Sequence, residues 1–81
     1  MEGSVPDEFL CPITREIMVD PVVVADGYTY ERTSIAQWFA SGKNTSPMMN
    51  TVLPHMNLVP NRPLKSAILR FSGPEPVNFI V

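Results

Sequence analysis

The sequence predicts a small α+β domain in which one β-hairpin, two helices and two large ordered loops share a single core. Three observations indicate this fold class. Residues 20–30 have the composition of a hairpin, residues 31–41 and 61–70 have helical spacing, and nine prolines are distributed along the 81-residue chain. Because proline interrupts helices and central strands, nine of them indicate few regular elements and long ordered loops.

The predicted hairpin occupies residues 20–30. Residues 22–24 are three valines, which favour strands, and residues 28–30 suit a return strand. Between them Asp26-Gly27 is a dipeptide typical of hairpin turns.

The central helix is predicted over residues 31–41, directly after the hairpin. Ile35, Trp38 and Phe39 recur at i, i+3 and i+4, and Gly42 is a natural terminator. Ile35 and Phe39 are expected to point into the core, with Trp38 at the border of the stripe. Trp38 either fills core volume or docks a partner, and helical spacing alone leaves both interpretations open.

A second helix is predicted over residues 61–70. Asn61 is a good N-cap, and Pro63 is tolerated in the first turn because its missing N–H is not needed there. Leu64, Ile68 and Phe71 lie at i, i+4 and i+7 and define the apolar face.

The remaining segments are predicted as loops. Pro12 excludes a regular helix or a paired central strand near the first loop, where Ile13 is either a buried loop residue or an exposed contact. Residues 43–50 form a second loop that contains Pro47, and residues 51–53 are expected to form a short strand. Met56 and Leu58 are expected to point inward.

Composition narrows the class of protein. A single cysteine, Cys11, and a single histidine, His55, provide neither an internal disulfide nor the usual zinc ligands, and the lone thiol fits a reducing compartment. The net charge is −2, and the six bases are spread along the sequence, so nucleic-acid binding is not expected. No apolar run is long enough to span a membrane and no signal-peptide pattern is present, which favours an intracellular, cytoplasmic or nuclear protein.

Several short motifs follow one another along the chain, namely Asp7-Glu-Phe-Leu-Cys-Pro-Ile-Thr, Asp20-Pro-Val, Gly27-Tyr-Thr-Tyr-Glu-Arg, Ile35-Ala-Gln-Trp-Phe, Ser46-Pro, Leu58-Val-Pro-Asn and Leu64-Lys. Together they resemble the U-box family, the zinc-free relatives of RING domains that act as ubiquitin ligases. The resemblance covers residues 7–71 and divides the chain into a lead-in (1–6), the U-box domain (7–71) and a tail (72–81). It implies a RING-like fold with no metal and no cofactor.

The resemblance also implies which residues replace zinc ligands. The eight positions that hold zinc in RING domains are occupied here by Cys11, Thr14, Asp26, Tyr28, Glu31, Ser34, Ser46 and Met49. These positions would be joined crosswise, so that Cys11 and Thr14 lie with Glu31 and Ser34, and Asp26 and Tyr28 lie with Ser46 and Met49. A structural zinc contributes roughly 10–16 kcal/mol to folding, whereas one hydrogen bond contributes about 0.5–1.5 kcal/mol, or about 1.5–3 with a charged partner. We therefore expect several bonds with Asp26 and Glu31 as charged acceptors; the alternative is that these are ordinary loop residues.

By the same resemblance, the partner is a ubiquitin-conjugating enzyme. Ile13, Trp38 and Pro47 are implied to form a shallow apolar groove for its loops, and Met48 would extend this groove. The ligase would position the thioester-linked ubiquitin for attack by a substrate lysine and supply no nucleophile of its own. Many relatives carry a bridging Arg or Lys three residues after the proline of the second loop, where this chain has Asn50.

Two other functions are considered. One is a U-box-like interaction or dimerisation module that no longer engages a conjugating enzyme, and the family resemblance also leaves a homodimer open. The other is a Cys11 nucleophile, which is disfavoured because Pro12 follows it and the only histidine is distant in sequence. The substrate protein is not indicated by the sequence.

Overall fold

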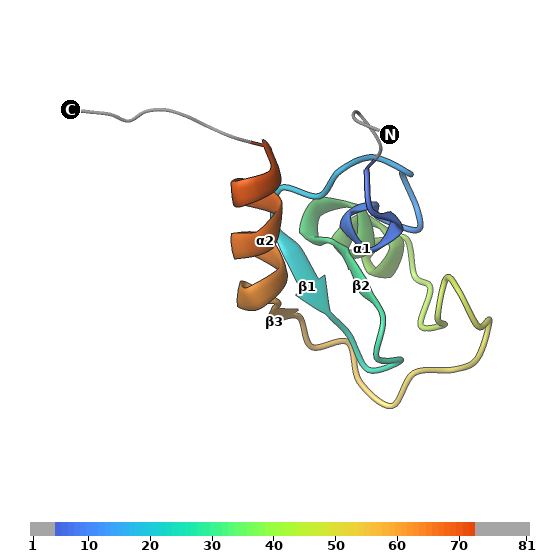
Figure 1. Cartoon of the computed structure of the whole chain (residues 1–81). Coiled ribbons are helices and arrows are strands. Elements are labelled where there is room, and N and C mark those ends of the chain that lie inside the picture. The colour runs from blue at the N-terminus through green and yellow to red at the C-terminus, as the bar shows by residue number, and fades with distance from the viewer. Residues whose placement is uncertain (1–4, 73–81) are drawn as a thin grey trace.

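The computed structural model describes residues 5–72, and most of the predicted lead-in and tail (residues 1–4 and 73–81) lies outside the described residues. The elements follow in the order η1 (a 3₁₀ turn, Asp7–Phe9), β1 (Pro21–Val23), β2 (Thr29–Glu31), α1 (Arg32–Ala40), β3 (Val59–Pro60) and α2 (Arg62–Ser72). In Figure 1 the strands lie between α2 on one side and α1 on the other. The α+β fold class predicted from the sequence is confirmed.

The predicted hairpin is formed by β1 and β2. They pair antiparallel with Val22 opposite Tyr30, and the N–H of Gly27 donates to the carbonyl of Val24. Gly27 has a φ of 85°, a left-handed conformation that glycine adopts without a Cβ penalty. The valine-rich strand and the Asp26-Gly27 turn therefore form as their composition indicates.

A third strand, β3, was not predicted from the sequence. It pairs with β1 so that Val22 lies opposite Pro60, which gives the strand order β2-β1-β3. Only two residues long and containing proline, β3 has no alternating pattern by which it could be recognised. It nevertheless places the start of α2 beside β1.

Both predicted helices form, close to their expected bounds. In α1 Ile35 is fully buried, while Trp38 and Phe39 are half-buried, and Gly42 follows the helix with a φ of 95°. At the start of α2 the side-chain Oδ1 of Asn61 accepts the N–H of Leu64 at 3.2 Å, which confirms the N-cap.

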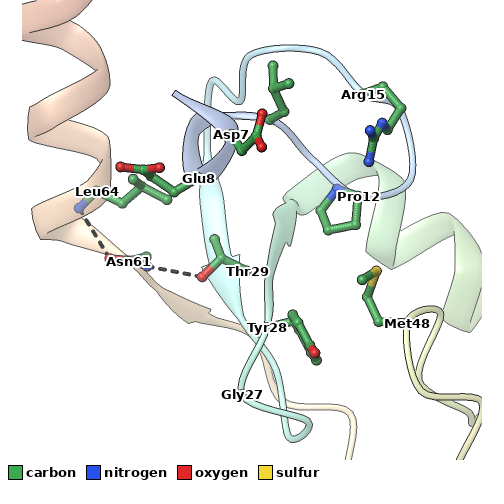
Figure 2. A pocket seen from close by; sticks show the side chains of 11 residues that line it. Asp7, Glu8, Pro12, Arg15, Gly27, Tyr28, Thr29, Met48, Asn61 and Leu64 are labelled. Carbon is green, nitrogen blue, oxygen red and sulfur yellow. Dashed lines mark hydrogen bonds between the residues drawn. The ribbon is translucent and has the colours of Figure 1, made fainter. Parts of the chain in front are cut away.

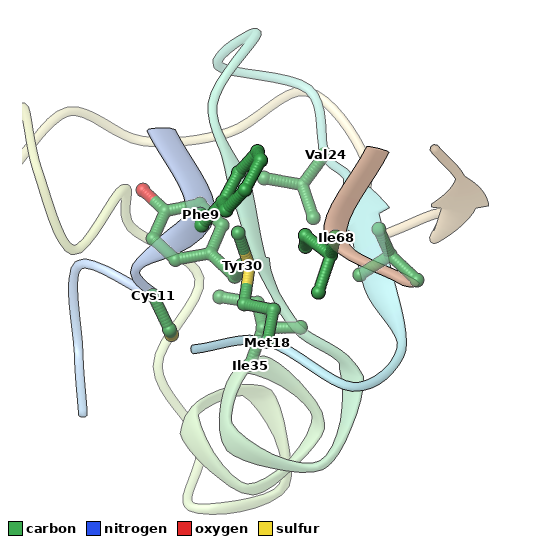
Figure 3. Close-up of a cluster of buried hydrophobic side chains, with 8 residues drawn as sticks. Phe9, Cys11, Met18, Val24, Tyr30, Ile35 and Ile68 are labelled. Carbon is green, nitrogen blue, oxygen red and sulfur yellow. The ribbon is translucent and has the colours of Figure 1, made fainter. Parts of the chain in front are cut away.

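The core is one cluster with side chains from η1, the first loop, the hairpin and both helices (Figure 3). Its members are Phe9, Cys11, Met18, Val22, Val24, Tyr30, Ile35 and Ile68. The ring of Phe71 lies edge-on to that of Phe9, with centroids 5.4 Å apart, so the C-terminal half of α2 covers η1. Full burial of a large apolar side chain contributes about 1.5–3 kcal/mol, so this cluster supplies much of the stability of the domain.

Two loop predictions are wrong. Residues 51–53 do not form a strand, because the segment makes only one isolated bridge, between Thr45 and Val52. Met56 was expected inside but is 49% exposed, since the irregular segment around it runs over the surface; Leu58 does pack against the core. Within residues 5–72 no helix is long and apolar enough to cross a membrane.

Candidate functional site

Two six-residue turns with the same backbone hydrogen bonds form the centre of the two large loops. In the first turn (residues 11–16) Arg15 N–H donates to the Cys11 carbonyl at 2.7 Å, and Cys11 N–H donates to the Glu16 carbonyl at 2.9 Å. In the second turn (residues 46–51) the equivalent bonds, from residue 50 to 46 and from 46 to 51, are both 2.8 Å. Each turn has a proline in second place and a left-handed fifth residue, with φ of 62° at Arg15 and 61° at Asn50.

The second turn is fixed to the hairpin by the carboxylate of Asp26. One oxygen, Oδ2, accepts the hydroxyl of Ser46 at 2.6 Å and that of Tyr30 at 2.8 Å; the other, Oδ1, accepts the N–H of Tyr28 at 2.8 Å. Ser46 is 1% exposed and Tyr30 is fully buried. The Asp26 carboxylate thus accepts three hydrogen bonds, two of them from buried hydroxyls.

The Ser46 hydroxyl also organises the turn that contains it. While it donates to Asp26, its oxygen accepts the N–H of Met49 at 2.9 Å and that of Met48 at 3.2 Å. One side chain thus joins the backbone of the second turn to the hairpin carboxylate. Met49 participates through its backbone N–H, and its side chain is 53% exposed.

The first turn is fixed differently, through a thiol. The fully buried Sγ of Cys11 accepts the N–H of Glu31 at 3.3 Å. A thiol is a weak acceptor, so this bond contributes less than those to Asp26.

The Glu31 carboxylate supplies the stronger bonds near the first turn. It accepts the N–H of Val19 at 2.6 Å and that of Asp20 at 3.1 Å, which fixes the chain that leads into β1. Asp20 in turn pairs with Arg32, with Nε and Oδ2 2.7 Å apart.

The structure does not bring all the sequence-predicted polar residues together. Thr14 Oγ1 accepts only the nearby N–H of Glu16, at 3.2 Å. Ser34 makes no side-chain hydrogen bond within residues 5–72, and the phenol of Tyr28 is likewise not part of the network, since only its N–H takes part.

Three members of the polar contacts, Tyr30, Asp20 and Arg32, were not predicted from the sequence. Tyr30 was taken only as a strand residue, whereas in β2 it is the buried residue between the half-buried Thr29 and Glu31, and its hydroxyl donates to Asp26. Figure 3 shows its ring within the apolar cluster and its hydroxyl at the margin. Burial, together with the hydrogen bond to Asp26, raises the pKa of Tyr30 well above its ordinary value, so the phenol stays protonated and remains a donor.

The residues assigned to the partner groove are accessible in part. Ile13 and Met48 occupy the same third position of the two turns and are 38% and 49% exposed. Pro47 and Trp38 are half-buried. The indole Nε1–H of Trp38 donates to the Thr45 carbonyl at 2.7 Å, which fixes the indole to the second loop.

A hollow of about 600 Å³ lies between the first loop, the hairpin turn and α2 (Figure 2). Pro12 and Arg15 line it on one side, Met48 and Tyr28 on another, and Leu64 on the side of α2. Of the four groove residues only Met48 lines this hollow, so the hollow adjoins the candidate groove rather than containing it. Among residues 5–72, no group of three or more His, Cys, Asp or Glu side chains could hold a metal ion.

Comparison with known proteins identifies the family. The family model for the U-box domain matches residues 5–74, and the chain therefore belongs to the U-box family. WD repeat, SAM and U-box domain-containing protein 1 is 61% identical over 70 residues in Danio rerio and 54% identical over 71 residues in Homo sapiens. U-box domain-containing protein 36 of Arabidopsis thaliana is 59% identical over 63 residues.

These matches cover most of this chain but little of the relatives. The three alignments span 86%, 88% and 78% of the chain, whereas they span only 14–15% of the relatives' own lengths. The similarity therefore concerns the U-box domain alone.

Proposed function

We propose that this chain is a ubiquitin-ligase domain that binds a ubiquitin-conjugating enzyme and promotes ubiquitin transfer from its thioester to a substrate lysine. The observation that carries the proposal is the pair of equivalent turns, each with a proline followed by an exposed apolar side chain, Ile13 or Met48. Family membership supports the same function. A domain of this kind would act inside the cell, in the cytoplasm or the nucleus.

The contact surface of the proposal consists of Ile13, Trp38, Pro47 and Met48. The rigid turns hold Ile13 and Met48 in place before binding, and the Trp38–Thr45 hydrogen bond does the same for the indole. Such preorganised apolar side chains lose little conformational entropy on binding. Because the surface is small, the complex should be weak and transient.

Transfer would proceed by positioning, without a covalent intermediate on this chain. The thioester remains on the conjugating enzyme, and holding ubiquitin against it raises the fraction of reactive geometries. The Cys11 thiol is fully buried and accepts the N–H of Glu31, which argues against its use as a nucleophile. The polar contacts of Asp26, Ser46, Glu31 and Cys11 would replace the metal of RING domains, so the thermal unfolding midpoint should not change when a chelator is added.

The alternative is an interaction or dimerisation module that has lost ligase activity. Asn50 favours this alternative, because many relatives carry an Arg or Lys at this position that would bridge the conjugating enzyme and ubiquitin. Asparagine is shorter and uncharged and makes weaker bridging contacts. In the proposed ligase, Asn50 occupies the bridging position with reduced effect.

The test is ubiquitin discharge from a panel of preloaded conjugating enzymes to free lysine. Ile13→Ala and Trp38→Ala should each lower the discharge rate about tenfold, as expected for a central interface residue worth ~1.4 kcal/mol. Ile17→Ala is the matched control, because Ile17 is 37% exposed against 38% for Ile13 and lies outside the first turn. Association without discharge across the whole panel would favour the silent module instead.

A further inference from the structure

A second, smaller hollow lies on the molecule away from the contact surface. It has a volume of about 220 Å³ and lies between the start of β1, the end of β3 and the first turns of α1 and α2. Its charged lining consists of Arg32, Arg62, Lys65 and Asp20. We call it the basic hollow.

The basic hollow concentrates positive charge in an acidic chain. It gathers three of the six Lys and Arg residues, although their positions in the sequence suggested that the bases were spread out. Three bases against one acid give a local charge of +2, whereas the whole chain carries −2.

Most of this positive charge has no carboxylate partner among residues 5–72. Asp20, the one carboxylate among the lining residues that the structure describes, already pairs with Arg32 through Nε. Within residues 5–72 neither Arg62 nor Lys65 has a carboxylate within 4 Å, and both are exposed. Arg32 is 39% exposed at its side chain and retains free donors on its two Nη groups.

The backbone that carries these bases is held rigidly. Asn61 N–H donates to the Pro21 carbonyl at 2.9 Å, and its Nδ2 donates to Thr29 Oγ1 at 3.1 Å. Arg32 N–H donates to the Asp20 carbonyl at 3.0 Å. The backbone positions from which the three cationic side chains project are therefore fixed relative to one another before an anion binds.

We propose that the basic hollow binds an acidic segment of a partner protein through its Asp or Glu carboxylates. Guanidinium groups donate to carboxylate oxygens in bidentate geometry, and the positive charges of Arg62 and Lys65 complement those of the carboxylates. A volume of about 220 Å³ is smaller than the pockets that hold drug-sized ligands but accommodates one or two carboxylate side chains.

Charge and shape disfavour a nucleic acid at this place. Among the described residues no aromatic side chain lines the hollow for bases to stack on, and the net charge of the chain opposes a polyanion beyond the hollow itself. None of the contact-surface residues lines the basic hollow, so an acidic segment and a conjugating enzyme could bind together.

The test titrates the isotopically labelled 81-residue chain with an acetylated hexaglutamate peptide at low salt, with hexaglutamine as the uncharged probe. We expect saturable NMR shifts at Arg32, Arg62 and Lys65 with hexaglutamate only. The Arg62→Gln/Lys65→Gln variant should bind at least tenfold more weakly. Arg15→Gln/Arg70→Gln, which removes the same charge at exposed positions outside the hollow, should change the affinity less than twofold.

Other outcomes would overturn the proposal. Equal weakening in both double variants would show attraction to net charge rather than to the hollow, and shifts that never saturate would show the same. An oligouridylate that shifts the same three residues at lower concentration than hexaglutamate would identify a nucleic-acid site. Unchanged circular dichroism and unfolding midpoints in both variants ensure that these comparisons concern folded protein.

Discussion

The first and second turns have the same backbone and different means of attachment. Both are closed by the same pair of hydrogen bonds and have a left-handed fifth residue. The second turn is fixed by the Ser46 hydroxyl and the Asp26 carboxylate, which bond to each other and to four further donors. The first turn is fixed by one weak bond to the Cys11 thiol. The turn geometry therefore does not require one particular chemistry at its first residue.

The difference also concerns burial. At the second turn the hydroxyls of Ser46 and Tyr30 are removed from water and depend on Asp26 for a partner. At the first turn the Glu31 carboxylate accepts backbone N–H groups at a partly exposed site, where water can substitute. Because an unsatisfied buried group costs more than a lost exposed bond, the second turn should be the more sensitive of the two.

The largest effect is expected from Asp26→Ala. This change removes the acceptor of three donors, two of them buried hydroxyls, and should lower the free energy of unfolding by about 3–4 kcal/mol. For a domain of this size that is a large part of the total, so much of the variant should be unfolded at 37 °C. Urea denaturation followed by circular dichroism measures the loss.

Asp7→Ala is the control for Asp26→Ala, because Asp7 is exposed and its substitution removes the same charge. A loss below about 1 kcal/mol for Asp26→Ala, the scale of one ordinary hydrogen bond, would show that the second turn is not the more sensitive of the two.

A smaller effect is expected from Glu31→Ala near the first turn. The two lost bonds, to Val19 and Asp20, are partly exposed, and we expect a decrease of about 2 kcal/mol in the free energy of unfolding. Thr14→Ala, which removes one local exposed bond, should stay within about 0.5 kcal/mol of the parent chain. If Glu31→Ala lowers the free energy of unfolding as much as Asp26→Ala does, partial exposure does not make the bonds near the first turn less important.

Alkaline pH should weaken the second turn selectively. The pKa of Tyr30 is higher in the folded chain than its unfolded value of about 10. The stability that this raised pKa provides is complete below about pH 10 and is lost as the pH rises through the folded pKa. Tyr30→Phe should cost about 1 kcal/mol at neutral pH and should reduce the decline in stability above pH 10; parallel declines in both proteins would count against this role.

The sequence predicts those elements whose interactions lie between residues close together in the chain. The hairpin, both helices and the Asn61 cap follow from patterns within about ten residues, and the family resemblance followed from motifs spread along the chain. β3 could not be predicted, because its two residues form a strand only by pairing with β1. In that pairing Pro60 lies opposite Val22, and 37 residues separate the two in the sequence.

The hydrogen bonds of the site likewise have partners that the sequence predicts and partners that it does not. Asp26 and Glu31 were expected as charged acceptors because of their positions in the resemblance, but their donors were not. Tyr30, Val19 and Asp20 become partners only when the hairpin brings them alongside, and no pattern in the sequence distinguishes a backbone N–H that will need a carboxylate. The equivalence of the two turns was also visible only in their backbone hydrogen bonds.

The smallest effect concerns Asn50→Arg, at the left-handed fifth position of the second turn. Asparagine tolerates this conformation better than most residues, yet Arg15 already adopts a φ of 62° at the equivalent position of the first turn. The comparison therefore indicates that arginine fits, at a cost below about 1 kcal/mol. With the longer, charged side chain restored at the bridging position, ubiquitin discharge should rise about threefold, or ~0.6 kcal/mol in activation free energy.

Asn57→Arg adds the same charge at an exposed position outside the turn and should leave the discharge rate unchanged. An equal gain in both variants would point to a general electrostatic attraction of the conjugating enzyme. A folded Asn50→Arg chain with no gain would remove Asn50 from the bridging role, because the first turn shows that the backbone does not prevent arginine from adopting the required conformation. The two turns would then be equivalent in backbone only, and the fifth residue of the second turn would not contribute to transfer.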